Sequence, residues 1–98
     1  LIIDDMIDTA GTTVNAANAA KDNGAKSVTA VATHALLSGS AIERIKESAI
    51  KKLIVTDTVS IPENKKLDNM EIVSVAQVFG EAIRRVYKGE SVSALFEF

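Results

Sequence analysis

The chain has 98 residues, 47% of them hydrophobic, and its 11 basic and 13 acidic side chains give a net charge of −2. This composition indicates a single globular domain and supplies no basic surface for nucleic acid or an anionic membrane. The lack of cysteine excludes a disulfide framework, and the sequence shows neither a signal peptide nor an apolar run of about 20 residues. We therefore expect a cytoplasmic protein without a membrane or nucleic-acid partner.

Apolar runs alternate with helical patterns along the chain, which predicts an α/β fold in which crossover helices join the strands of a parallel sheet. The first strand is expected at residues 1–4 and the first helix at 12–23. Gly24 supplies the left-handed residue at which this helix stops. The many alanines of the helix permit close packing on the sheet.

The second strand is expected at residues 27–32, followed by a polar loop and a second helix. Ser40 and Glu43 have the spacing of a capping box, in which the two side chains bond to each other's backbone N–H groups at a helix start. Three apolar residues supply the inward face of this helix: Ile42, Ile45 and Ala49.

In the second half of the chain, strands are expected at 52–56 and 71–75, with an exposed turn at 64–69 between them. The last helix ends at Gly89, and a short β-like tail follows it. One stripe of this helix is apolar and consists of Val78, Phe79, Ala82, Ile83 and Val86.

The opening stretch LIIDDMIDTAGTT joins a strand to a helix through a turn of small residues. The turn from Asp8 to Thr12 offers consecutive backbone N–H groups and two hydroxyls at a helix start, where the helix dipole favours an anion. Gly11 lets the backbone approach a phosphate closely. Asp4 and Asp5, expected at the strand end, suit sugar hydroxyls or a bound magnesium ion. The stretch therefore predicts a site for a phosphorylated sugar.

Ligands of open α/β sheets bind outside the carboxyl ends of the strands. Besides the aspartate pair, Thr33 and His34 and the residues 56–58 are expected at such ends, so the three groups should converge on one rim. His34 is the only histidine and has no neighbouring ligand set in the sequence, which favours a structural role. Asp57 and Thr58 are interpreted as a hydrogen-bonded turn, with support of the site as the alternative. A solvated basic face is expected near the end of the last helix, at Arg84, Arg85 and Lys88.

The segment DDMIDTAGT resembles the ribose-phosphate loop of the phosphoribosyltransferase fold, and specifically that of the ribose-phosphate pyrophosphokinase (PRPP synthetase) family of bacterial type. Three further segments carry the resemblance along the chain: ATHALLSGSAIERI at 32–45, VTDTV at 55–59 and ESVSALFEF at 90–98. The family more often has Gly at the position of Ala35, and often Pro at the position of Ser40. Both departures lie outside the phosphate loop.

The resemblance implies a role for each residue of the loop. Asp4 and Asp5 would face the ribose hydroxyls, while the next group would wrap the 5′-phosphate: Asp8, Thr9, Ala10, Gly11 and Thr12. In the tail, the matching serines and phenylalanine of bacterial enzymes line a regulatory site for phosphate or ADP at a subunit interface, here Ser91, Ser93 and Phe96. Two hydroxyls two residues apart share one side of a strand, which suits contact with one anion. An edge strand with apolar anchoring is the alternative for this tail.

The family transfers a diphosphoryl group from Mg-ATP to ribose 5-phosphate, making PRPP and AMP, and assembles as a hexamer. By resemblance, residues 1–98 form the carboxyl-terminal part of a phosphoribosyltransferase-type, Rossmann-like domain that binds ribose 5-phosphate. The catalytic residues, the metal ligands and most ATP contacts would lie outside this segment, so no catalytic residue and no firm metal ligand is assigned here, although Mg²⁺ is the expected cofactor. We expect the segment alone to be inactive.

Three other interpretations stay open. A type I phosphoribosyltransferase shares the acidic pair and the phosphate loop, although its motif more often has Thr-Gly within the stretch from Asp8 to Gly11. A non-catalytic, synthetase-associated regulatory protein would have degraded motifs, against which the intact DDMIDTAGT argues. An unrelated mononucleotide-binding module would not discriminate ribose 5-phosphate from AMP.

Overall fold

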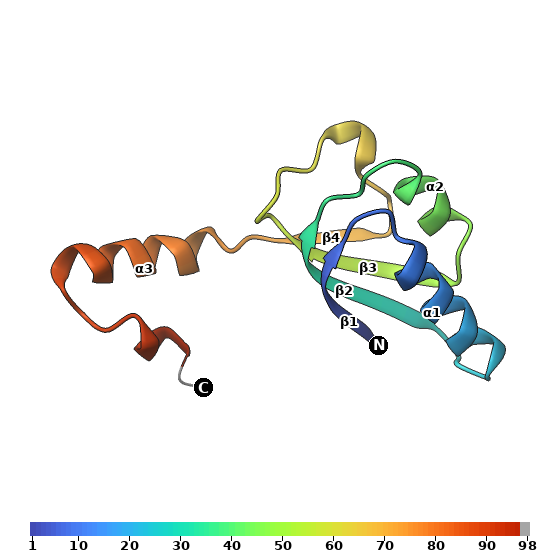
Figure 1. Cartoon of the computed structure of the whole chain (residues 1–98), viewed down its shortest axis with the longest axis horizontal. Coiled ribbons are helices and arrows are strands. Elements are labelled where there is room, and N and C mark those ends of the chain that lie inside the picture. Colours follow the sequence, from blue (N-terminus) through green and yellow to red (C-terminus); the bar gives the residue numbers. More distant parts are fainter. Residues whose placement is uncertain (97–98) are drawn as a thin grey trace.

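The computed structural model describes residues 1–96 and contains one sheet of four parallel strands in the order β1-β2-β3-β4 (Figure 1). The strands are β1 (Ile2–Ile7), β2 (Val28–Ala35), β3 (Ile50–Thr56) and β4 (Met70–Val73). The predicted α/β fold with a parallel sheet is therefore confirmed. Glu97 and Phe98, the last two residues of the ESVSALFEF segment, lie outside the described residues.

Three α-helices and two short 3₁₀ turns connect or follow these strands. They are α1 (Gly11–Asp22), α2 (Ala41–Lys46), η1 (Glu63–Lys65), α3 (Ala76–Lys88) and η2 (Ser93–Phe96). Helix α1 packs against the first three strands and against α2, so both helices lie on the same side of the sheet (Figure 1). No helix among residues 1–96 has the length and apolar character needed to cross a bilayer.

Strands β1 and β2 are longer at their carboxyl ends than the sequence predicts. Met6 pairs with His34 and Ile7 pairs with Ala35. The parallel ladder thus continues past the polar residues at which the apolar runs of the sequence stop. Asp4 and Asp5, predicted at the strand end, consequently both lie inside β1. The ladder can extend because backbone hydrogen bonding does not depend on side-chain polarity, and the side chains of residues 3–6 of β1 are exposed.

The core lies between the sheet and the two helices and is built from alanine and aliphatic residues. Its buried members are Ile7, Ala10, Ala17, Val28, Ala30, Ala32, Ala35, Leu37, Ala41, Ile45, Ile50, Leu53 and Val55. Ala17 of α1 is completely buried, which confirms the close approach of this alanine-rich helix to the sheet. Asn23 and Gly24 end α1, and Gly24 has the predicted positive φ of 98°.

The capping box predicted for α2 does not form. Ser40 precedes the helix, but its backbone has φ −88° and ψ 18° rather than the extended conformation of an N-cap, and its side chain makes no capping hydrogen bond. Ile45 is buried and Ile42 packs against the core, as predicted. Ala49 lies beyond the end of this short helix.

The predicted exposed turn at 64–69 is only partly exposed. Residues 63–65 form η1, and Leu67 packs against the core just before β4 begins. An apolar side chain within an otherwise polar stretch thus anchors the connection between β3 and β4.

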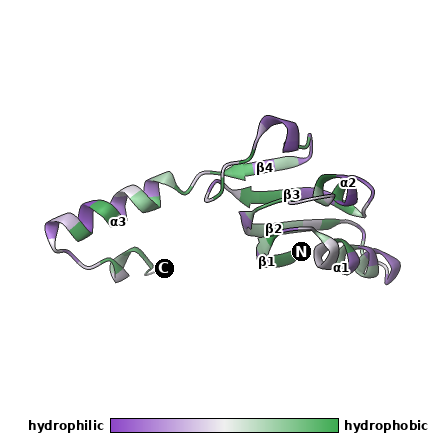
Figure 2. Ribbon diagram, turned by 45° about the horizontal axis from the view of Figure 1, so that its top comes forward, coloured by the Kyte–Doolittle hydropathy of each residue, from purple (hydrophilic) through white to green (hydrophobic). Residues whose placement is uncertain are grey.

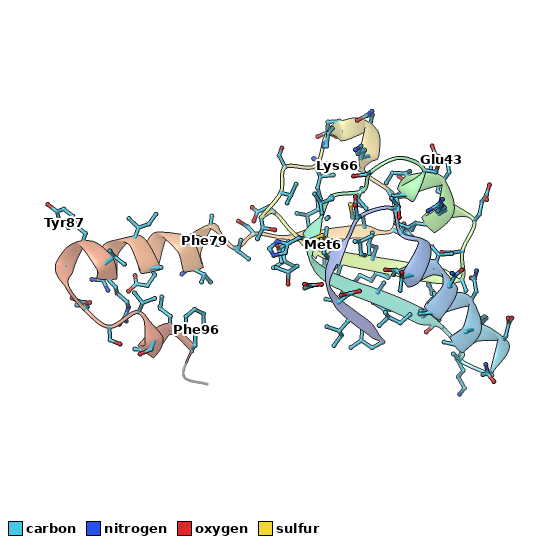
Figure 3. All side chains as sticks on the ribbon, in the orientation of Figure 1. Met6, Glu43, Lys66, Phe79, Tyr87 and Phe96 are labelled. Atoms are coloured by element: carbon cyan, nitrogen blue, oxygen red, sulfur yellow. The ribbon has the colours of Figure 1, made fainter. Side chains whose placement is uncertain are left out.

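Helix α3 projects away from the sheet, as Figure 1 shows. It ends at Gly89, with φ 70°, as predicted, and its apolar stripe alternates with polar residues in Figure 2. None of its residues is buried: Phe79 is 57%, Ile83 69% and Tyr87 90% exposed. In Figure 3 the side chains of Phe79 and Tyr87 extend away from the helix into open space.

The prediction of a β-like tail is wrong, because residues 93–96 form the 3₁₀ turn η2. A strand needs a neighbouring strand to satisfy its N–H and C=O groups. Helix α3 carries the tail away from the sheet, so it finds no such neighbour among residues 1–96.

Candidate functional site

A hollow of about 210 Å³ opens where β1 passes into α1. Its lining consists of Asp4, Met6, Ile7, Asp8, Thr9, Ala10, Gly11, Thr12 and Thr13. Six of the seven residues predicted to bind the sugar phosphate are in this set, and only Asp5 is not. The structure therefore brings the predicted loop together around one cavity.

The two aspartates of β1 are not equivalent. Side chains alternate along a strand, so those of Asp4 and Asp5 belong to opposite faces, and of the two only Asp4 lines the hollow. The backbone N–H of Asp5 donates to Oδ1 of Asp4 at 2.8 Å. Hydrogen bonding by Asp5, first through its side chain and then through this N–H, holds the pKa of Asp4 below its ordinary value. Asp4 thus presents an ionised carboxylate at the hollow at neutral pH.

The outer side of the loop is held by the segment 36–44, which follows β2. The carbonyl oxygen of Ile7 accepts hydrogen bonds at 3.0 and 3.1 Å from the first two amides after β2, and that of Asp8 accepts one at 2.8 Å from Ser38. Nη1 of Arg44 donates to the carbonyl oxygen of Thr9 at 3.1 Å. Three consecutive carbonyls of the loop are therefore engaged on one side.

This arrangement fixes where the loop amides point. In a trans peptide the N–H is directed opposite to the C=O of the preceding residue. Because the carbonyls of residues 7–9 point toward the segment 36–44, the N–H groups of Asp8, Thr9 and Ala10 point away from it. These three residues line the hollow, so their amides are available to an anion held there.

The start of α1 adds further donors. The first intrahelical hydrogen bond runs from the N–H of Val14 to the carbonyl of Ala10 at 2.9 Å. The amides of Gly11, Thr12 and Thr13 precede it and have no acceptor in the helix. Such a run of amides at the positive end of a helix dipole is an established kind of anion site.

The left-handed residue of the loop is Ala10, with φ 69° and ψ 6°, and not Gly11. A Cβ added to Gly11 would lie 3.5 Å from Nη1 of Arg44, an ordinary van der Waals contact. Gly11 is therefore not required by the backbone conformation. The sequence-based prediction that a glycine here allows a ligand to approach the backbone closely stays a prediction.

The second and third groups of the predicted rim bind each other. The hydroxyl of Thr58 donates to the carbonyl of Thr33 at 3.1 Å and lies 2.8 Å from Nδ1 of His34, while the hydroxyl of Thr56 donates to the same carbonyl at 2.7 Å. None of these side chains lines the hollow. Among residues 1–96 no group of three or more His, Asp and Glu side chains is placed to hold a metal ion. The structural interpretation of His34 is thus favoured.

Asp57 anchors the connection between β4 and α3. Its Oδ1 accepts a hydrogen bond from the N–H of Val75 at 2.9 Å. This bond, followed by one from the Ser74 side chain, lowers the pKa of Asp57. The Asp57 side chain is therefore hydrogen-bonded, as predicted, but its partner lies 18 residues further along the chain and not in a local turn.

The basic residues near the end of α3 are not simply a solvated face. Arg84 and Arg85 both pair with Glu81, and the hydrogen bond from Arg84 is the largest of the effects that lower the pKa of Glu81 from 4.5 to about 2. Nη1 of Arg85 also donates to the carbonyl of Ser91 at 3.0 Å. The hydroxyls of Ser91 and Ser93 lie 2.8 Å apart, so the two predicted tail serines are adjacent although the tail is not a strand.

A profile of the phosphoribosyl synthetase-associated domain family matches residues 1–97. The chain belongs to this family. It is 55% identical to a ribose-phosphate pyrophosphokinase of Caldanaerobacter subterraneus subsp. tengcongensis and 58% identical to one of Corynebacterium ammoniagenes, in each case over 96 residues that make up 98% of this chain and 30% of the relative. The crystal structure of phosphoribosylpyrophosphate synthetase from Mycobacterium smegmatis superimposes with a TM-score of 0.86 and 39% identity, over 89% of this chain and 29% of that one. The predicted family resemblance is confirmed, and the chain spans about 30% of the length of these relatives.

This phosphoribosyl synthetase-associated domain has a second, larger hollow of about 460 Å³ near the amino ends of β3 and β4. Its lining is Ser27, Thr29, Lys51, Lys52, Asp68, Asn69, Met70 and Glu71. Two of these residues, Lys52 and Glu71, form an ion pair at 3.2 Å. The charges within it are mixed, and none of the residues predicted for the sugar-phosphate site or the tail site is present there.

Two residues that support the loop, Ser38 and Arg44, are not predicted from the sequence. Both lie within the family segment at 32–45, but nothing in their spacing relates them to a loop some 30 residues earlier. Only the ladder between β1 and β2, which brings the ends of both strands together, places them beside Asp8 and Thr9.

Proposed function

We propose that the hollow binds the 5′-phosphate of ribose 5-phosphate, and that the chain supplies this half of the site of a ribose-phosphate pyrophosphokinase. The enzyme would transfer the diphosphoryl group of ATP to the anomeric hydroxyl of the sugar, giving PRPP and AMP. The observation that carries the proposal is that residues 8–13, which supply the amides of the loop and of the first turn of α1, line one hollow. Relatives 55 and 58% identical to the chain, which bear this enzyme's name, support it.

Different residues of the loop and of β1 would bind the phosphate and the ribose of the ligand. The amides and the helix dipole bind the phosphate, and the hydroxyls of Thr9 and Thr12 can donate to its oxygens. Asp4 lines the same hollow from β1, and its ionised carboxylate can accept hydrogen bonds from ribose hydroxyls. Asp5 does not line the hollow, so its contact with the ribose, which the family resemblance implies, would be made outside the hollow.

We extend the proposal to Mg²⁺ as the cofactor. Asp4 can offer one hard oxygen ligand, and Mg²⁺ is commonly held by one or two carboxylates together with substrate phosphates and water. The ion would neutralise charge that develops during transfer. Residues 1–96 hold no cluster of three metal-ligating side chains, so further ligands would come from ATP, from water or from the remaining length of an enzyme like its relatives.

The same proposal covers regulation and assembly. The adjacent hydroxyls of Ser91 and Ser93 can both turn toward one anion, as a phosphate or ADP site requires, while Phe96 is 62% exposed and free to contact a ligand or a second subunit. A homo-hexamer in the cytoplasm follows from the family resemblance. Because the ATP site and the catalytic cations would lie in the other parts of the enzyme, the 98-residue chain alone would bind ribose 5-phosphate without turnover.

The proposal is tested on the protein at its full natural length, incubated with Mg-ATP and ribose 5-phosphate while AMP and PRPP are measured. Gly11→Val puts a branched side chain on a residue that lines the hollow, beside the guanidinium of Arg44, and should abolish saturation by ribose 5-phosphate. Gly80→Val is the matched control, because Gly80 lies in α3 with open space around its Cβ position. Full activity of the folded Gly11→Val variant would contradict the proposal. Consumption of PRPP with a nitrogenous base, and no AMP from ATP, would indicate a type I phosphoribosyltransferase instead.

A further inference from the structure

The guanidinium of Arg44 joins α2 to the loop that follows β1. Its Nη1 donates to the carbonyl oxygen of Thr9 at 3.1 Å, across 35 residues of sequence. The same nitrogen lies 3.5 Å from the position of a Cβ on Gly11, so the guanidinium sits beside the start of α1. Arg44 does not line the hollow, which means that it contacts the loop from outside the ligand space.

Arg44 binds the peptide that joins Thr9 to Ala10, and Ala10 has an unfavourable backbone conformation. Ala10 has a φ of 69°, a left-handed conformation that costs a non-glycine residue free energy and persists only where the surroundings impose it. The carbonyl of Thr9 and the N–H of Ala10 belong to the same trans peptide and point in opposite directions. A hydrogen bond that holds the carbonyl therefore also holds the N–H toward the hollow.

The charge of Arg44 adds to this geometric effect. A permanently positive group beside the amides of residues 9–11 raises the local potential at the place where a phosphate would sit. The guanidinium of an arginine is planar and carries five N–H donors in fixed directions. One of these donors binds the carbonyl of Thr9. A lysine at this position would retain the charge but not the fixed planar orientation.

We propose that Arg44 is a positioning residue for the sugar-phosphate loop, which orients the Thr9–Ala10 peptide for binding of the 5′-phosphate. The inference rests on the proposed function and deepens it. Arg44 acts through the loop, so its removal should weaken recognition of the phosphorylated sugar and leave recognition of ATP unchanged.

The experiment compares Arg44→Ala, Arg44→Lys and Lys46→Ala in the protein at its full natural length. Lys46 is on the same short helix, and its side chain makes no hydrogen bond or ion pair with residues 1–96, so its removal controls for loss of one positive charge. In Arg44→Ala the KM for ribose 5-phosphate should rise roughly tenfold, the size expected for loss of a hydrogen bond from a charged donor, with the KM for ATP constant within about twofold. Arg44→Lys should fall between the wild type and Arg44→Ala, and Lys46→Ala should match the wild type.

Thermal unfolding of each variant separates positioning from general stability. An unchanged KM for ribose 5-phosphate in folded Arg44→Ala would overturn the role of Arg44, and so would equal rises in the KM for both substrates. Wild-type protein that forms no AMP in response to ribose 5-phosphate would instead overturn the proposed function itself. Isothermal titration of ribose 5-phosphate against unphosphorylated ribose gives an independent reading, because a loss confined to the phosphorylated sugar identifies the phosphate loop.

Discussion

The backbone N–H of Ser38 donates to the carbonyl oxygen of Asp8 at 2.8 Å, so the loop that follows β2 holds the loop that follows β1. The neighbouring residue Leu37 is fully buried and has a φ of 55°. It is this turn that brings the segment 36–44 against the candidate site. The orientation of the loop amides thus depends on residues far along the chain as well as on the loop's own sequence.

Leu37 should therefore be one of the most sensitive residues of the domain. Leu37→Ala removes a completely buried side chain and should lower the free energy of unfolding by about 3 kcal/mol, within the range measured for leucine truncation in cores. Leu36→Ala is the matched control, because Leu36 is 37% exposed and its truncation should cost less than about 1.5 kcal/mol. Urea denaturation measures both values, and equal losses would contradict the assigned packing.

The conformation and burial of Ala10 restrict which side chains this position of the loop can accept. A Val at this position would combine a branched side chain in the left-handed region with overpacking of a residue that is 4% exposed. We expect Ala10→Val to destabilise the protein by about 2 to 4 kcal/mol and to weaken ribose 5-phosphate binding. Ala16→Val, on the exposed side of α1, should cost about 0.5 kcal/mol. Calorimetry of ligand binding and thermal unfolding would test the pair, and tight binding by Ala10→Val would contradict the assigned cradle.

Ionisation of Glu81 links the stability of α3 to pH. Hydrogen bonds from Arg84 and Arg85 lower the pKa of Glu81 from 4.5 to about 2, so the ionised form is favoured in the folded helix. The stabilisation is fully present above pH 4.5 and is lost as the pH falls through about 2. NMR chemical shifts of α3 amides, recorded between pH 6 and pH 2, should follow this titration in the wild type.

Glu81→Gln should remove that pH dependence, because the amide does not titrate. Glu43→Gln serves as the control, since Glu43 is an exposed residue of α2 and makes no ion pair among residues 1–96. An α3 titration that persists in Glu81→Gln would show that another group is responsible.

Much of the fold and of the site follows from local patterns. The strand-turn-helix order of residues 1–13 is enough to predict the hollow, because the same few residues supply the strand end, the donors and the helix start. The apolar periodicity likewise predicts helix α3, and Gly89 predicts where it ends. These features depend on residues that are neighbours in sequence, which is why they can be predicted without a structure.

Other features depend on contacts between distant segments and could not be predicted in this way. The register that pairs Met6 with His34 extends β1 beyond its apolar run and thereby places Asp4 and Asp5 on opposite faces. The contact of Arg44 with Thr9 arises from the same register. For the apolar stripe of α3 the reason is different. Periodicity identifies an apolar helix face but does not identify what covers that face.

The exposed apolar stripe of α3 leads to a prediction for the 98-residue chain itself. Opening of α3 uncovers no buried side chain, whereas opening of β2 or β3 disrupts the core around Leu53, which is completely buried. Amides of α3 should therefore exchange with solvent through local opening, at least about tenfold faster than those of β2 and β3. Phe79→Ser should change the free energy of unfolding by less than about 1 kcal/mol, and Leu53→Ala should lower it by about 3 kcal/mol. Hydrogen exchange measured by mass spectrometry, with the two variants compared by urea denaturation, provides the test. Equal protection of α3 and β3, with a large loss in Phe79→Ser, would mean that the stripe is covered in solution.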